Sequence, residues 1–106
     1  MSHTVLVIEP FADLRLEIAA TLRRQHYTCD AVATAAEGTA VMGARSYDHV
    51  VIDLESTGNF ASSVDPSMHV ILLTDQDSSE VGGYATLRKP FSRDELTSSL
   101  SRSTVL

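Results

Sequence analysis

Four short, mostly apolar runs, each closed by a polar residue, most constrain how this chain can fold. Residues 5–8 end at Glu9, residues 50–52 at Asp53, residues 70–73 at Thr74 and residues 84–88 at Lys89. Apolar runs of this length, separated by helical or polar stretches, predict the buried strands of a parallel sheet. Ligand sites in such sheets lie beyond the carboxyl ends of the strands, so we expect the closing residues at one rim. Two carboxylates, a hydroxyl and an ammonium suit a nucleophilic carboxylate, a divalent cation and a phosphoryl group.

Composition limits the kind of protein. The chain has 106 residues, enough for one domain over residues 1–106, and its apolar fraction of 43% fits a globular core. The net charge of −6 argues against nucleic acid as a partner, since binding it requires a basic face. Cys29 is the single cysteine, which fits a reducing compartment. No run has membrane-spanning length and no signal-type segment begins the chain, so we expect a cytoplasmic protein that acts by contact with other molecules.

Strands and helices are expected to alternate along the chain. Strands are predicted over residues 4–9, 27–33, 49–53, 68–74 and 84–88, and helices over residues 13–26, 35–45 and from 93 onward. Thr34–Glu37 and Ser92–Glu95 have the form of capping boxes, in which a hydroxyl and a carboxylate satisfy free N–H groups at a helix start. This alternation predicts a doubly wound α/β protein with a five-stranded parallel sheet.

The closing residues, their order and the Lys-Pro-Phe turn after the last strand resemble the receiver domain of bacterial two-component response regulators. The segments that carry the resemblance are residues 5–9, 13–15, 47–54, 72–74 and 88–91. Each match is weak alone, but the ordered set in one small α/β chain is specific. The resemblance covers the chain from Val5 to about Ser101 and implies the flavodoxin-like receiver fold.

The resemblance also implies a chemistry for the rim. Asp53 would accept a phosphoryl group from a phosphohistidine of a sensor histidine kinase or phosphotransfer protein, and a downstream protein would sense the change. Mg²⁺ would be held by Asp53, Glu9 and the carbonyl of Glu55. Thr74 would hydrogen-bond a phosphoryl oxygen, and Lys89 would pair first with Asp53 and then with the phosphate. The only catalysis implied is Mg²⁺-dependent self-phosphorylation and autodephosphorylation.

Several positions depart from the receiver pattern or tune it. Pro10 stands where receivers usually carry a second acidic residue, so we expect weak Mg²⁺ binding. Thr86 replaces the usual aromatic switch residue, and Tyr84, on the same strand face, is the candidate substitute. Gln76 and Glu55 occupy positions that tune phosphate lifetime in receivers. The Lys89–Pro90 bond is expected to be cis, so that Pro90 aims the lysine.

The segments between the last three strands are shorter than in receivers by about two helical turns. We therefore expect a short third helix and a reduced or absent fourth helix. Parallel sheets need both faces covered, so one face of the fourth and fifth strands should be exposed and available to a partner or to a second copy in a homodimer.

Two other functions stay open. A pseudo-receiver would keep the fold as an interaction module without phosphorylation, which Pro10 favours. The stretch from Asp53 to Thr57 also resembles the nucleophile motif of haloacid-dehalogenase-type phosphatases, with Glu55 in the general-acid position. The four histidines show no ligand spacing, so no zinc site is predicted, and His49 and His69 are expected to be partly buried or at an edge.

Overall fold

The computed structural model describes residues 4–56, 68–75, 80–81 and 84–101. The elements in chain order are β1 (Thr4–Ile8), α1 (Ala12–Arg24), β2 (Thr28–Val32), α2 (Ala35–Met42), β3 (His49–Asp53), the 3₁₀ turn η1 (Leu54–Ser56), β4 (His69–Thr74), β5 (Glu80–Val81), β6 (Tyr84–Arg88) and α3 (Arg93–Ser101). The five predicted strands are confirmed, and β3 and β6 have the predicted limits.

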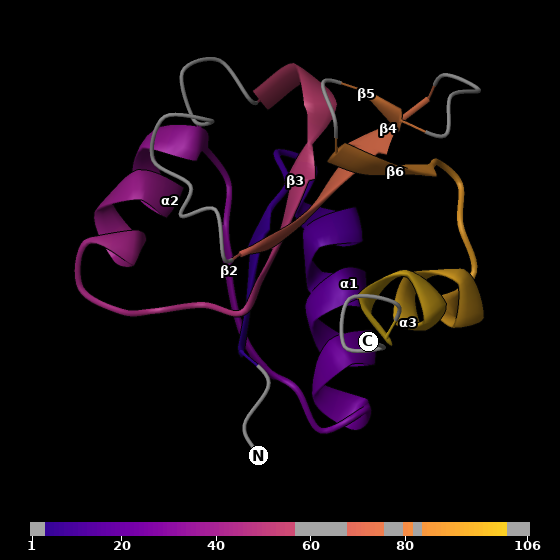
Figure 1. The fold of residues 1–106 in the computed structure, drawn as a ribbon, viewed down its shortest axis with the longest axis horizontal. Coiled ribbons are helices and arrows are strands. Elements are labelled where there is room, and N and C mark those ends of the chain that lie inside the picture. The colour runs from indigo at the N-terminus through magenta and orange to yellow at the C-terminus, as the bar shows by residue number, and fades with distance from the viewer. Residues whose placement is uncertain (1–3, 57–67, 76–79, 82–83, 102–106) are drawn as a thin grey trace.

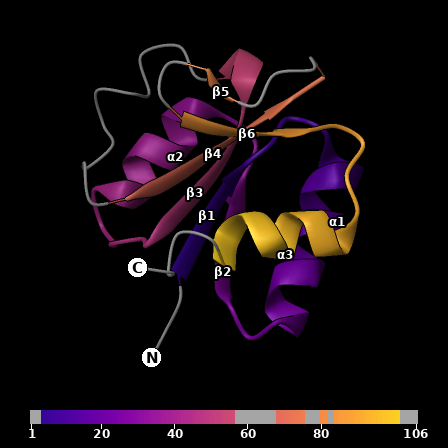
Figure 2. The same ribbon diagram turned by 45° about the vertical axis from the view of Figure 1, so that its right-hand side comes forward.

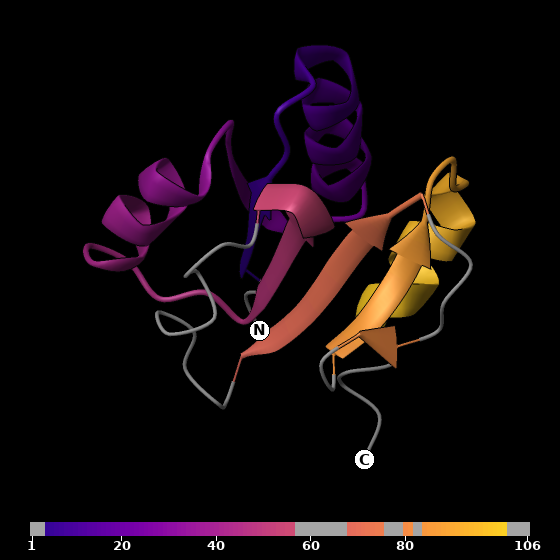
Figure 3. The same ribbon diagram turned by 90° about the horizontal axis from the view of Figure 1, so that it is seen from above.

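The strands form one sheet in the order β2-β1-β3-β4-β6-β5 (Figure 1). The first five in this order are parallel, and β5 pairs antiparallel with β6. Seen from above, β3, β4 and β6 run in the same direction and the short β5 opposes them (Figure 3). The order reverses between β1 and β3, and in open α/β sheets the crevice beyond such neighbours binds ligands.

Helices lie on both faces of the sheet. Helices α1 and α3 lie side by side on one face, and α2 lies on the other (Figure 2). Each strand sends alternate side chains to the two faces, so the buried residues form two clusters. On the α1 and α3 face the cluster includes Val7, Ile18, Ile71 and Leu96. On the α2 face it includes Ile52 and Leu72.

The predicted capping box at Ser92–Glu95 is formed in both directions, whereas at Thr34–Glu37 the carboxylate of Glu37 accepts from the Thr34 hydroxyl. The Oγ1 of Thr34 accepts a hydrogen bond from the N–H of Glu37 at 3.1 Å. At Ser92–Glu95, the N–H of Ser92 donates to Oε1 of Glu95 at 2.9 Å. The N–H of Glu95 donates back to Oγ of Ser92 at 3.1 Å. These bonds fix where α2 and α3 begin, and the start of α3 sets the end of the Lys-Pro-Phe turn that precedes it.

Two expectations about the connections need correction or stay open. Among the described residues no helix lies between β4 and β6, as predicted, but β5 pairs there as a strand that the sequence interpretation missed. The predicted short third helix falls on residues 57–67, outside the described part of the chain. No described helix is long and apolar enough to cross a membrane.

The predicted exposed face covered the fourth and fifth strands, and for the fourth strand, β4, the prediction is wrong, while Tyr84 and Thr86 of β6 are half-buried. On the side away from α1 and α3, Val70 is 5% and Leu72 is 4% exposed within the single chain. Leu54, Met68 and Tyr84 pack against the same cluster, so apolar side chains from neighbouring segments cover this face. The structure therefore gives no argument for a homodimer through it.

Candidate functional site

The closing residues of four strands meet at one rim of the sheet. Glu9 follows β1, Asp53 ends β3, Thr74 ends β4 and Lys89 follows β6. Because β4 and β6 pair in register, the N–H of Lys89 donates to the carbonyl oxygen of Thr74 at 2.7 Å, which fixes the start of the lysine side chain. The Lys89–Pro90 peptide bond is cis, as predicted.

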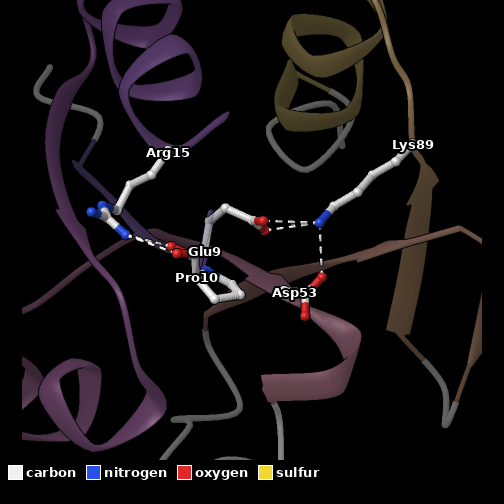
Figure 4. A network of polar contacts seen from close by, with 5 residues as sticks. All are labelled: Glu9, Pro10, Arg15, Asp53 and Lys89. Carbon is white, nitrogen blue, oxygen red and sulfur yellow. Dashed lines mark hydrogen bonds and ion pairs between the residues drawn. The ribbon is translucent and has the colours of Figure 1, made fainter. Parts of the chain in front are cut away.

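The ammonium of Lys89 joins the two carboxylates of the rim. Its Nζ lies 3.0 Å from both Oε1 and Oε2 of Glu9 and 2.9 Å from Oδ1 of Asp53 (Figure 4). The side chains are 20%, 0% and 13% exposed for Lys89, Glu9 and Asp53 respectively, so all three groups lie largely out of water. Ionised groups in such a setting require close partners, and here each has one.

The charge on Lys89 is stabilised by this arrangement. Burial by itself lowers the pKa of Lys89, but the hydrogen bonds to Asp53 and Glu9, together with the attraction of their negative charges, hold the pKa above its ordinary value. The lysine therefore stays a cation at neutral pH. Its Nζ also lies 5.8 Å from the centroid of the Phe11 ring, a distance at which an aromatic face attracts a cation.

A second cation holds the loop after β1 from its other side. The guanidinium of Arg15 donates from Nη1 to the carbonyl oxygen of Glu9 at 2.9 Å, with a longer contact of 3.5 Å to the carbonyl oxygen of Pro10. Figure 4 shows Arg15 and Lys89 on opposite sides of Glu9. The sequence interpretation did not assign Arg15 a role, although its position one turn into α1 places it beside this loop.

The rim opens into a hollow of about 200 Å³ beside Asp53. Its lining includes Asp53, Glu55, Thr74 and Lys89, together with Pro10 and Phe11. Thr74 is 3% exposed, whereas Glu55 is exposed in η1. The hollow brings the proposed nucleophile, hydroxyl and ammonium to one small space, which is the arrangement predicted from the strand ends.

The other predicted site residues lie farther from this hollow. Tyr84 is half-buried at the start of β6, and Thr86, two residues on, pairs with Leu72 of β4. Pro90 is exposed and lines a separate groove of about 390 Å³ between α1 and α3. Gln76 lies outside the described residues.

Sequence interpretation missed a contact between two histidines at the opposite end of the sheet. The Nδ1 atoms of His49 and His69 lie 3.2 Å apart, and His49 is 2% exposed. Both residues begin strands, and β3 and β4 pair in the register that sets them opposite each other. In the sequence, each of these histidines directly precedes an apolar run, and this shared position could have indicated that they lie opposite each other.

Known structures resemble this fold closely. No family model matches the sequence, and no curated protein matches it. The chemotaxis response regulator CheY4 of Vibrio cholerae superposes with a TM-score of 0.85 at 22% identity, over 97% of this chain and 99% of that one. An orphan response regulator of H. pylori gives a TM-score of 0.84 at 24% identity, over 98% of both chains. A receiver domain from Methylobacillus flagellatus gives 0.80 at 16% identity, over 97% of this chain and 99% of that one.

These likenesses define the fold. The protein is an α/β protein of the flavodoxin-like kind, with a five-stranded parallel sheet extended by one short antiparallel strand. More particularly, its fold is that of the response regulator receiver domain. At these identities the likeness concerns the fold, and the chemistry of the rim depends on its own residues.

The rim residues do not fit a magnesium ion. Mg²⁺ requires near-octahedral oxygen ligands at about 2.0–2.1 Å and gives up water reluctantly. Pro10 offers no carboxylate, and both oxygens of Glu9 already contact the Lys89 ammonium. In the part of the chain that the structure describes, no three histidine, cysteine or acidic side chains are placed to hold a metal ion. No step below is therefore assigned to a metal.

Proposed function

We propose that this protein is a signalling receiver that accepts a phosphoryl group on Asp53 from a phosphohistidine of a sensor histidine kinase or phosphotransfer protein. The observation that carries this proposal is the contact of 2.9 Å between the Lys89 ammonium and Asp53 Oδ1, beside a hollow that Thr74 also lines. A carboxylate at a strand end, held by a cation and open to a small cavity, is arranged for an incoming anion.

In the proposed reaction the second oxygen of Asp53 attacks the phosphorus atom. The new P–O bond forms as the P–N bond to the donor imidazole breaks, and the leaving nitrogen takes a proton from solvent. Lys89 keeps Asp53 oriented and offsets the charge of the phosphoryl oxygens. The hydroxyl of Thr74, at the edge of the same hollow, is the hydrogen-bond donor for one of those oxygens.

The signal is proposed to pass by protein contact. Thr74 ends β4, which pairs with β6, and Thr86 of β6 lies opposite Leu72. A change at Thr74 on phosphorylation therefore has a short covalent and hydrogen-bonded route to Thr86 and Tyr84. A downstream protein that contacts this edge would sense it, in a cytoplasmic setting where the kinase acts.

The experiment is phosphorylation by phosphoramidate, a small donor with the same P–N bond, followed by intact mass. Wild type should gain the mass of one phosphoryl group and Asp53→Asn should not. Asp75→Asn is the matched control, because Asp75 is an exposed carboxylate that lines the same hollow. Equal labelling of wild type and Asp53→Asn would sink the proposal.

A pseudo-receiver is the second candidate function. The observation that favours it is the pairing of Lys89 with Glu9 as well as with Asp53, which ties the lysine to two carboxylates at once. In that case the wild type would take up no phosphoryl group, and its partner would bind equally well to Asp53→Asn. The remaining alternative, a haloacid-dehalogenase-type phosphatase, is tested by incubating the wild-type protein with an aryl phosphate and measuring its hydrolysis.

A further inference from the structure

One cation already joins the two acidic side chains of the rim. The Lys89 ammonium lies within 3.0 Å of both Glu9 oxygens and 2.9 Å from Asp53 Oδ1. A divalent ion binding these carboxylates would compete with the ammonium for both Glu9 oxygens and for Oδ1 of Asp53 (Figure 4). The group that neutralises the two acids is therefore part of the chain.

The surroundings of the pair oppose a second cation. Glu9 is fully buried, so its carboxylate cannot turn toward solvent to offer an oxygen elsewhere. Pro10 adds no negative charge, and Arg15 places a second fixed positive charge at the Glu9 carbonyl. An arriving Mg²⁺ would meet the Lys89 ammonium on both Glu9 and Asp53, and the other two acids that line the hollow, Glu55 and Asp75, are exposed. Since the affinity for Mg²⁺ rises with the number of anionic ligands, the missing carboxylate at position 10 weakens binding.

We propose that Lys89 is the permanent counter-ion of Glu9 and Asp53 in place of a divalent cation, so that this receiver neither binds Mg²⁺ at millimolar concentrations nor needs it to accept a phosphoryl group. The first half concerns binding and stands on the contacts alone. The second half rests on the proposed function. Charge balance at the rim is thereby independent of the metal supply.

The binding half is tested by melting temperature in metal-free buffer with increasing MgCl₂. Wild type should show no Mg²⁺-specific rise beyond that given by NaCl at equal ionic strength. Pro10→Asp restores a carboxylate at an exposed position and should rise by on the order of 5 °C at ten times its dissociation constant. Pro10→Ala is the matched control, because it removes the ring without adding a charge, and should behave as wild type.

Two outcomes would overturn the binding half. A rise in wild type equal to that of Pro10→Asp would show that Mg²⁺ binds despite Lys89. A Pro10→Asp protein that is folded but unresponsive would show that the missing carboxylate is not the reason. Lys89→Met gives an independent reading: with the ammonium gone, Mg²⁺ should raise its melting temperature, and no rise would count against the exchange of one cation for the other.

The phosphorylation half uses phosphoramidate and intact mass, with either MgCl₂ or EDTA. Equal labelling of Asp53 in both buffers is the expected result. Labelling only with MgCl₂ would overturn this inference and leave the proposed function standing. No labelling in either buffer would overturn the proposed function, and the melting experiment would still decide whether Lys89 replaces the metal.

Discussion

The two ends of the β3–β4 pair both bury titratable side chains, but they balance them in different ways. At the carboxyl end, Oδ1 of Asp53 lies 2.9 Å from the ammonium of Lys89. At the amino end, the imidazoles of His49 and His69 face each other with their Nδ1 atoms 3.2 Å apart. A hydrogen bond between two such nitrogens requires one to carry a proton and the other to lack it, so a second proton has no place there.

The difference shows what burial demands of each kind of group. Opposite charges persist at the rim because each has a partner within 3.0 Å. At the other end, burial lowers the pKa of His69 below its ordinary value of 6.5, which favours the neutral imidazole. Removal of a partner should therefore damage the rim most, whereas protonation should damage the histidine end.

The largest effect is expected from Lys89→Met. It leaves the fully buried Glu9 without its cation, and loss of one partner of a buried pair costs about 3–5 kcal/mol of the free energy of unfolding. Urea denaturation at neutral pH measures it. Glu9→Gln in the same chain should recover most of the loss, because the uncompensated charge is then gone. If Lys89→Met alone were as stable as wild type, water or another group would have to neutralise Glu9, and the prediction would be wrong.

A smaller effect is expected from acid at the histidine end. The folded state binds fewer protons than the unfolded state below pH 6.5, since the pKa of His69 is lowered by burial. Stability is therefore full above pH 6.5 and falls as the pH drops toward the folded-state pKa, by up to about 1.4 kcal/mol per pH unit. Urea denaturation at pH values between about 7.5 and 5 would measure this loss in the free energy of unfolding. This range extends roughly one to two units on either side of the ordinary histidine pKa.

The control for the acid effect separates this pair from other histidines. His69→Gln should flatten the pH dependence over this range. His26→Asn should leave it unchanged, because His26 is exposed and its φ of 71° suits asparagine. A flat profile in wild type, or an equal change in both variants, would show that the imidazole pair does not govern acid stability.

The smallest effect is expected from Arg45→Ala. Arg45 Nη1 lies 2.7 Å from Asp30 Oδ2, closer than Lys89 lies to either of its partners, but the arginine side chain is 60% exposed. Exposed ion pairs contribute roughly 0–1 kcal/mol, so the loss in urea denaturation should stay within that range. A loss as large as that of Lys89→Met would show that distance, and not burial, decides the strength of these pairs.

The parallel strands and their meeting point could be predicted from sequence because both follow from general rules. An apolar run of strand length that ends in a polar residue marks a buried strand, and parallel strands place their carboxyl ends together. This was enough to bring Glu9, Asp53, Thr74 and Lys89 to one rim. The contact between Lys89 and Asp53 was implied by the resemblance to receivers. The contact of both Glu9 oxygens with the same ammonium was not predicted, because it depends on side-chain rotamers.

Other features depended on longer-range geometry. The exposed face was predicted from missing helix length, but Val70 and Leu72 of β4 are buried in a cluster against which Leu54 and Met68 pack. The histidine contact depends on the register between β3 and β4, which no spacing along the chain gives directly.

The strand β5 had a local signal that was passed over. Gly82 and Gly83 stand between Val81 and Tyr84, and a Gly-Gly pair between two strand-forming residues is a hairpin pattern. Their two flanking residues pair antiparallel in the structure. The segment from Asp75 to Gly83 was interpreted as a turn-rich connection because it is short, Gly-rich and poor in apolar residues.

This two-residue strand has a consequence for how the molecule behaves in a crowded solution. β6 would otherwise be the last strand of the sheet, and a last strand offers unpaired N–H and C=O groups to any extended chain nearby. Glu80 and Val81 pair along the outer side of β6 at Ala85 and Tyr84. The chain thus supplies its own neighbour where β6 begins, and because β5 has only two residues, the edge it leaves is too short to favour pairing between copies.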